Sequence, residues 1–136
     1  MTIYHLPADI RISCLEVPTF PDGIPETFDL LFARLPTIEG RACYGISYME
    51  NNRIIYKAAA TEMSAGESQQ YGYESFIIPR GNYLTKTVNR WYENLPAVQA
   101  TFELLVKEPL MDSSFPCVEM YPDNETMVCM VRSLQQ

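Results

Sequence analysis

The sequence predicts an α+β fold in which a β-α-β-β order occurs twice, giving an antiparallel sheet with two helices on one side. Apolar residues recur at helical spacing in two stretches, near residues 24–35 and 95–106. Runs typical of strands precede and follow each stretch. The order strand, helix, hairpin occurs on both sides of a polar connector at residues 61–70. Two such units would pool their strands into sheet, and their uncovered faces would form a concave groove.

The first half-repeat is predicted at residues 10–61. Residues 11–17 alternate between polar and apolar side chains, which indicates a strand. The helix that follows has Pro25 in its first turn and Pro36 beyond its end, both common at these positions.

A hairpin is predicted to close the first half-repeat. Residues 41–49 and 53–61 are strand-like, and Asn51 and Asn52 stand between them. Asparagine tolerates the positive φ angles of tight turns, which favours a hairpin at this point.

The second half-repeat is predicted at residues 72–133. Asn94 is placed to cap its helix, and Pro96 lies in the first turn. Its strands are expected at residues 72–78, 82–88, 116–121 and 125–132, the last two forming a hairpin. We expect both half-repeats to belong to a single domain, residues 1–136.

Composition excludes several functions. Ten basic residues against 17 acidic ones give a net charge of −7, which argues against direct nucleic-acid binding. No apolar run approaches the roughly 20 residues of a membrane helix. The N-terminus lacks the features of a signal peptide, so we expect a cytoplasmic protein.

Metal and nucleophile sites also have little support. His5 is the single histidine, and we expect it to be solvated in an N-terminal tail. The four cysteines form no C-x-x-C pair, and each lies in a strand-like run: Cys14, Cys43, Cys117 and Cys129. We therefore expect no metal and no cofactor.

One acid lies at the centre of an otherwise apolar strand. Because strand side chains alternate, Cys117, Glu119 and Tyr121 are expected on one face. That face is either exposed to solvent or lines a cleft in which a negative charge has a use. A carboxylate among aromatic rings would attract a lipophilic cation, and cation–π contacts would add about 0.5–2 kcal/mol.

Four segments together resemble one family. They are YGISY at residues 44–48, IPRGNY at residues 78–83, ENLP at residues 93–96 and CVEMY at residues 117–121. In this order they are similar to segments of the GyrI-like, or bacterial transcription-activator effector-binding, domains. One departure is Arg90-Trp91-Tyr92, where many members carry a Gly-Pro turn.

The resemblance implies a ligand cleft between the half-repeats and a matching glutamate, Glu119, inside it. Relatives fused to a helix-turn-helix sense small, often cationic lipophilic compounds. This chain has no room for a helix-turn-helix, so we expect a stand-alone module for transcription regulation or multidrug binding, with a protein partner or a homodimer as possible assemblies. The expected ligand-binding residues are Glu119, Tyr121, Tyr44, Tyr48, Tyr56 and Trp91. Core packing is the alternative for Tyr121, and the other four aromatics are weaker candidates, since such residues more often belong to the core or the rim.

Two other functions stay open. Some GyrI-like members hydrolyse strained electrophilic compounds. In that case Glu119 would deprotonate a water and a tyrosine such as Tyr121 would hydrogen-bond the leaving group. A family namesake acts on gyrase, and an acidic surface could imitate DNA charge, although −7 over the whole chain is weak support.

Overall fold

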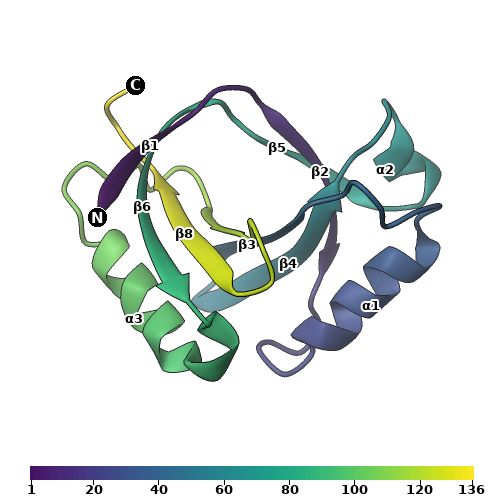
Figure 1. Ribbon diagram of the computed structural model, residues 1–136, viewed down its shortest axis with the longest axis horizontal. Coiled ribbons are helices and arrows are strands. Elements are labelled where there is room, and N and C mark those ends of the chain that lie inside the picture. Colours follow the sequence, from purple (N-terminus) through teal and green to yellow (C-terminus); the bar gives the residue numbers. More distant parts are fainter. The chain divides into compact units, whose positions relative to one another are not determined.

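The computed structural model describes residues 1–136, which divide into two compact units (Figure 1). Unit 1 comprises Met1–Ala8 and Pro79–Gln136, and unit 2 comprises Asp9–Ile78. Each unit contains antiparallel strands and one long helix. The predicted fold class is confirmed: the protein is α+β, and a β-α-β-β order occurs twice.

Unit 2 is a four-stranded antiparallel sheet in the order β3-β4-β2-β5. Helix α1 packs on one face of this sheet, against β4 and β2 (Figure 1). The elements are β2 (Ile10–Glu16), α1 (Ile24–Arg34), β3 (Cys43–Glu50), β4 (Arg53–Thr61), the short α2 (Glu67–Gln70) and β5 (Glu74–Ile78).

The local sequence explains the elements of unit 2. Helix α1 begins with a proline in its first turn, as predicted, and ends before Pro36. Its fully buried Leu31 lies in a core with Tyr56 and other apolar residues of the sheet. The β3–β4 turn has positive φ at both Asn51 (+51°) and Asn52 (+63°), which confirms the predicted hairpin.

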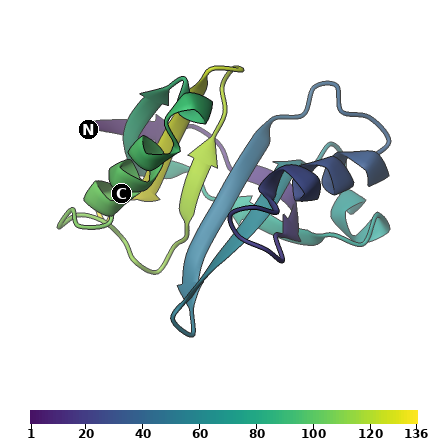
Figure 2. The same cartoon turned by 90° about the horizontal axis from the view of Figure 1, so that it is seen from below.

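Unit 1 is a four-stranded antiparallel sheet in the order β1-β6-β8-β7. Helix α3 lies over β6 and β8 (Figure 2). Asn94 caps this helix as predicted, because its side chain accepts a hydrogen bond from the Ala97 amide. The elements are β1 (Thr2–Leu6), β6 (Gly81–Asn89), the 3-10 turn η1 (Trp91–Glu93), α3 (Leu95–Leu105), β7 (Cys117–Met120) and β8 (Thr126–Arg132).

Each sheet is completed by a strand from outside its own β-α-β-β run. Strand β1 pairs with β6 in unit 1, and β5 pairs with β2 in unit 2. The expectation of an N-terminal tail at His5 is therefore wrong, although its expected exposure to solvent is confirmed. His5 is exposed, but it lies within β1, and its Nδ1 is 2.9 Å from Oδ1 of Asn82. A five-residue run whose first four side chains are all exposed gives no alternation by which a strand could be distinguished from an extended lead.

The connector at residues 61–70 is also more structured than its polar composition indicates. It contains α2, where Glu67 is buried and binds the Arg41 guanidinium through two hydrogen bonds of 2.5 and 2.8 Å. Glu62 accepts hydrogen bonds from the amide and hydroxyl of Ser68. The Ser68 hydroxyl also lies 2.7 Å from the Ser13 hydroxyl of β2, which joins the connector to the sheet of unit 2. None of the helices has the length and apolar character needed to span a bilayer.

Candidate functional site

Strand β7 presents Glu119 on the face of the unit 1 sheet that carries α3. Glu119 lies opposite Cys129 of β8, and Cys129 is part of the buried core beneath α3. Opposite residues of an antiparallel pair point to the same side of the sheet. Helix α3 packs over β6 and β8, whereas Glu119 lies on β7, the next strand of the sheet. Its side chain is therefore only half-buried.

Three of the predicted site residues meet at this point. The Tyr121 hydroxyl donates a 2.7 Å hydrogen bond to Oε1 of Glu119. The Tyr121 ring is tilted 60° against the Trp91 ring, with 5.3 Å between the centroids. All three side chains are half-buried. We call Trp91, Glu119 and Tyr121 the Glu119 cluster.

A backbone turn places Trp91 in the cluster. Arg90 has a left-handed conformation with φ of +51°, and the turn η1 begins directly after it. The Arg90 amide donates to the Glu125 carbonyl at 2.7 Å, and its guanidinium binds Glu93. This turn occupies the position where the resemblance leads one to expect Gly-Pro. The buried indole N–H of Trp91 has no acceptor within the protein.

The charge of Glu119 acts on two thiols of the same sheet. Burial and, secondly, the Glu119 carboxylate raise the pKa of Cys129 to about 12. Burial and, secondly, the same carboxylate also raise the pKa of Cys117. Both thiols therefore stay protonated near neutral pH and are poor nucleophiles. The group that can interact with a charged ligand is the carboxylate.

The other three predicted residues lie in unit 2. Tyr56 is buried beneath α1, and its ring stacks on Phe20 at 5.4 Å. The β3–β4 register places Tyr44 and Tyr48 on the opposite face of the same sheet. The Lys57 ammonium lies 5.3 Å from the centroid of the Tyr48 ring. The structure thus brings together Glu119, Tyr121 and Trp91, and it distributes the three tyrosines over both faces of unit 2.

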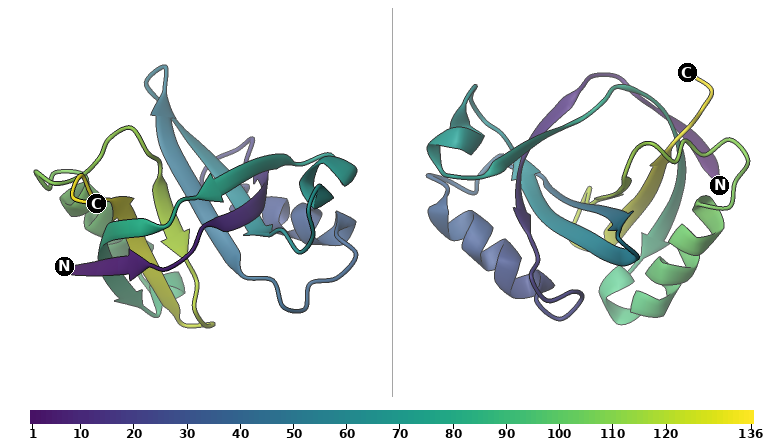
Figure 3. Two further views of the ribbon diagram at one scale, coloured as in Figure 1. Left: turned by 90° about the horizontal axis from the view of Figure 1, so that it is seen from above. Right: turned by 180° about the vertical axis from the view of Figure 1, so that it is seen from behind.

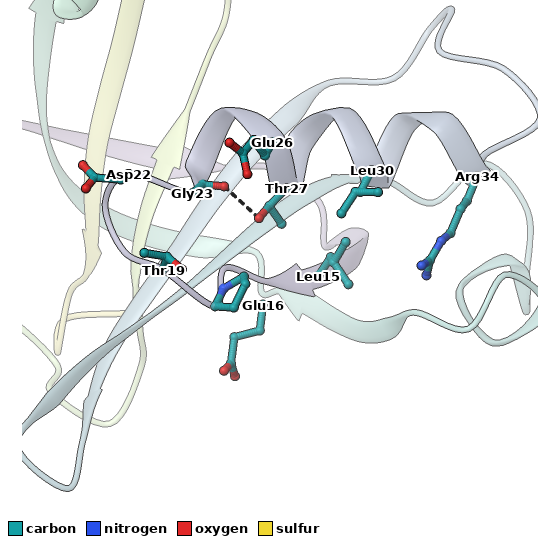
Figure 4. A pocket seen from close by; sticks show the side chains of 10 residues that line it. Leu15, Glu16, Thr19, Asp22, Gly23, Glu26, Thr27, Leu30 and Arg34 are labelled. Carbon is teal, nitrogen blue, oxygen red and sulfur yellow. Dashed lines mark hydrogen bonds between the residues drawn. The ribbon is translucent and has the colours of Figure 1, made fainter.

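Unit 2 also has an open groove of about 390 Å³ that the sequence did not indicate (Figure 4). It lies beside α1, and its charged lining residues are Glu16, Asp22, Glu26 and Arg34. All four are exposed to solvent. The groove therefore lacks a desolvated charge, and we regard the Glu119 cluster as the better candidate site. Nowhere do three His, Cys, Asp or Glu side chains gather closely enough to hold a metal ion.

Comparisons with known proteins find similar proteins by structure only. No family model and no curated protein matches the sequence. An integron cassette protein from the mobile metagenome of Vibrio cholerae aligns over 97% of this chain and 94% of its own, with a TM-score of 0.66 and 11% identity.

Two Listeria innocua structures are also similar. An uncharacterized conserved protein aligns over 96% of this chain and 90% of its own, with a TM-score of 0.57 and 9% identity. A hydrolase aligns over 97% of this chain and 90% of its own, with a TM-score of 0.56 and 8% identity. At such identities the likeness shows that these proteins share a fold along nearly their whole length.

Proposed function

We propose that this protein binds a small lipophilic or cationic aromatic molecule at the Glu119 cluster. One observation carries the proposal: a half-buried carboxylate is held by the Tyr121 hydroxyl beside the tilted rings of Tyr121 and Trp91. A lipophilic cation would gain charge attraction from Glu119 and cation–π contact with the rings. Partial burial strengthens this attraction because water screens the carboxylate less.

The wider role that we propose is that of a stand-alone effector-binding domain of the GyrI-like type. Its support is the four sequence segments together with a fold shared with small proteins such as the cassette protein. Such a domain would act in the cytoplasm as a transcription-related sensor, through a partner chain, or would sequester the compound. In this proposal the ligand cleft is lined by the Glu119 cluster.

Ligand titration tests the proposal. Trp91 is the only tryptophan, so its fluorescence reports directly on the cluster. Hydrophobic cations of graded size should quench it in a saturable way. Glu119→Gln should weaken binding by about tenfold or more, equivalent to roughly 1.4 kcal/mol. Glu103→Gln removes an exposed carboxylate from α3 and should bind like the wild type. A varied cation panel that gives no saturable signal would refute the proposal.

A second candidate is hydrolysis of a strained electrophile. The observation that favours it is the 2.7 Å pair between a carboxylate and a phenol, which are groups able to move a proton. Glu119 would take a proton from the attacking water as the carbon–oxygen bond breaks, while Tyr121, turned from Glu119 to the substrate, would give its proton to the departing oxygen and later recover one from Glu119. A fold shared with a Listeria innocua hydrolase is compatible with this chemistry. Repeated product release from an epoxide panel, lost in Glu119→Gln, would favour hydrolysis, whereas stoichiometric binding without turnover would exclude it.

A further inference from the structure

Strand β1 is an unusually open edge. It lies at the end of the strand order and pairs on one side only, with β6 (Figure 3). Four of its five residues are exposed, and Leu6 alone is buried. The exposed side chains include Ile3, at 58%, and Tyr4, at 38%. These two side chains point to opposite faces, so β1 is covered on neither face along most of its length.

The strand also lacks the usual protection of an edge. Residues Thr2–Leu6 contain no Asp, Glu, Lys, Arg or Pro. Proteins commonly place such residues on exposed edges to prevent pairing with other chains. The edge strand of unit 2 is different, because β5 carries the exposed Glu74, which forms an ion pair with Lys57. Strand β5 is therefore protected by charge, whereas β1 is left open.

We infer that β1 is the contact through which two copies of this chain pair edge to edge as an antiparallel dimer. A two-fold axis at Tyr4 places Tyr4 of one copy opposite Tyr4 of the other, and Ile3 opposite His5. The strand is then its own complement, as a two-fold interface requires. The unpaired backbone groups of the edge gain partners, and the exposed Ile3 side chain is shielded.

Charge favours a second copy at this edge over other faces. Each chain carries a net charge of −7, so two copies repel one another over most contacts. A strand without carboxylates, in which His5 is the one basic side chain, allows close approach without placing negative charges together. This inference is independent of the Glu119 cluster, since β1 and β7 lie at opposite ends of the unit 1 sheet.

The size of the contact predicts a weak dimer. Pairing five residues buries less than the roughly 1,200 Å² of a typical stable interface. We therefore expect the dimer to have a dissociation constant between about 10 µM and 1 mM. The dimer should accordingly depend on concentration.

Sedimentation of the full chain over this range tests the inference. The wild type should change from monomer to dimer with rising concentration. Ile3→Lys, at a position already exposed in the single chain, should stay monomeric to at least about tenfold higher concentration. Ile77→Lys is a matched control, because Ile77 is an exposed isoleucine on the other edge strand and its loss should leave the dimer intact.

Two results would overturn the inference. A wild-type chain that stays monomeric at about 1 mM would leave β1 to an extended segment of another protein. Equal dimerisation of Ile3→Lys and the wild type would place the interface elsewhere.

Cysteine cross-linking provides a second readout. Opposite residues of an antiparallel pair have Cα atoms about 4.5–5.5 Å apart, which a disulfide can bridge. Under oxidised glutathione, Tyr4→Cys should give a covalent dimer, and neither the wild type nor Ile77→Cys should. Adding Ile3→Lys to Tyr4→Cys should abolish the cross-link. Failure of Tyr4→Cys to cross-link in a sample that sediments as a dimer would reject the register centred on Tyr4.

Discussion

The phenolic hydroxyl of Tyr121 donates a 2.7 Å hydrogen bond to Oε1 of Glu119, two residues earlier in the chain. The bond fixes the orientation of the carboxylate, and the tyrosine ring continues to the contact with Trp91. A single tyrosine thus connects the charged part of the candidate site with its aromatic part.

Tyr121→Phe should separate the contribution of the Tyr121 hydrogen bond to stability from that of the Tyr121 ring. The substitution keeps the ring and removes the donor, so we expect a loss of about 1 kcal/mol in the free energy of unfolding. Tyr92→Phe is the control, because its ring also contacts Trp91 but the residue is exposed. Urea unfolding followed by circular dichroism measures both. Equal effects of the two substitutions would mean that the hydrogen bond contributes nothing to stability.

Two adjacent leucines of α1 should differ sharply in their contribution to stability. Leu31 is completely buried in the core of unit 2, whereas Leu30 is 53% exposed. Leu31→Ala should therefore lower the free energy of unfolding by about 2–5 kcal/mol through lost burial and the cavity left behind. Leu30→Ala should change it by less than about 0.5 kcal/mol. Denaturant midpoints compare the two, and similar midpoints would contradict the packing of α1.

The buried ion pair between Arg41 and Glu67 should make stability depend on pH. The hydrogen bonds from Arg41 hold the pKa of Glu67 below its ordinary value of 4.5. A lowered folded pKa stabilises the protein above pH 4.5, and this contribution is lost as the pH falls through the folded pKa. Glu67→Gln should cost about 3 kcal/mol at pH 7, because it leaves a buried guanidinium uncompensated.

The pH dependence separates this effect from simple misfolding. The difference between the wild type and Glu67→Gln should shrink as the pH falls below 4.5, since acid also neutralises the wild-type carboxylate. Glu103→Gln, at an exposed position, should parallel the wild type throughout. A Glu67→Gln deficit that stays constant down to pH 2 would contradict the ion-pair explanation.

Thiol reactivity should distinguish buried from half-buried cysteines. Burial raises the pKa of both Cys14 and Cys129 to about 12, so about one thiol in ten thousand is ionised at pH 8. Neither should react with an alkylating reagent in the folded protein. Cys43 and Cys117 are half-buried and should react first, though slowly, because burial raises their pKa as well. Mass spectrometry of the modified peptides would show the order.

Elements specified by neighbouring residues could be predicted from the sequence. Helices α1 and α3 follow from apolar spacing and nearby prolines, and the β3–β4 turn follows from Asn51 and Asn52. The Arg41–Glu67 pair joins residues far apart in the chain, so no local pattern indicates it. The same is true of β1, whose exposed side chains give no clear alternation.

In the candidate site, too, only the features specified by neighbouring residues could be predicted from the sequence. Alternation along β7 correctly places Glu119 and Tyr121 together, as their hydrogen bond shows. The contact between Tyr121 and Trp91 depends on the left-handed backbone conformation of Arg90. Residues other than glycine rarely adopt this conformation, and no sequence pattern predicts it here. Tyr56 lies on the opposite sheet face from Tyr44, and this depends on strand register.

The exchange of β1 and β5 has a consequence for synthesis on the ribosome. Unit 2 is one continuous segment, so all of its strands are available once Ile78 has emerged. Strand β1, by contrast, pairs only with β6, and β6 is itself paired with β8, which is complete only at Arg132; pairings so distant in sequence form slowly. A chain truncated after Ile78 should protect the amides of β2 and β4 from hydrogen exchange and leave those of β1 unprotected. The first strand to be made is then among the last to find its place.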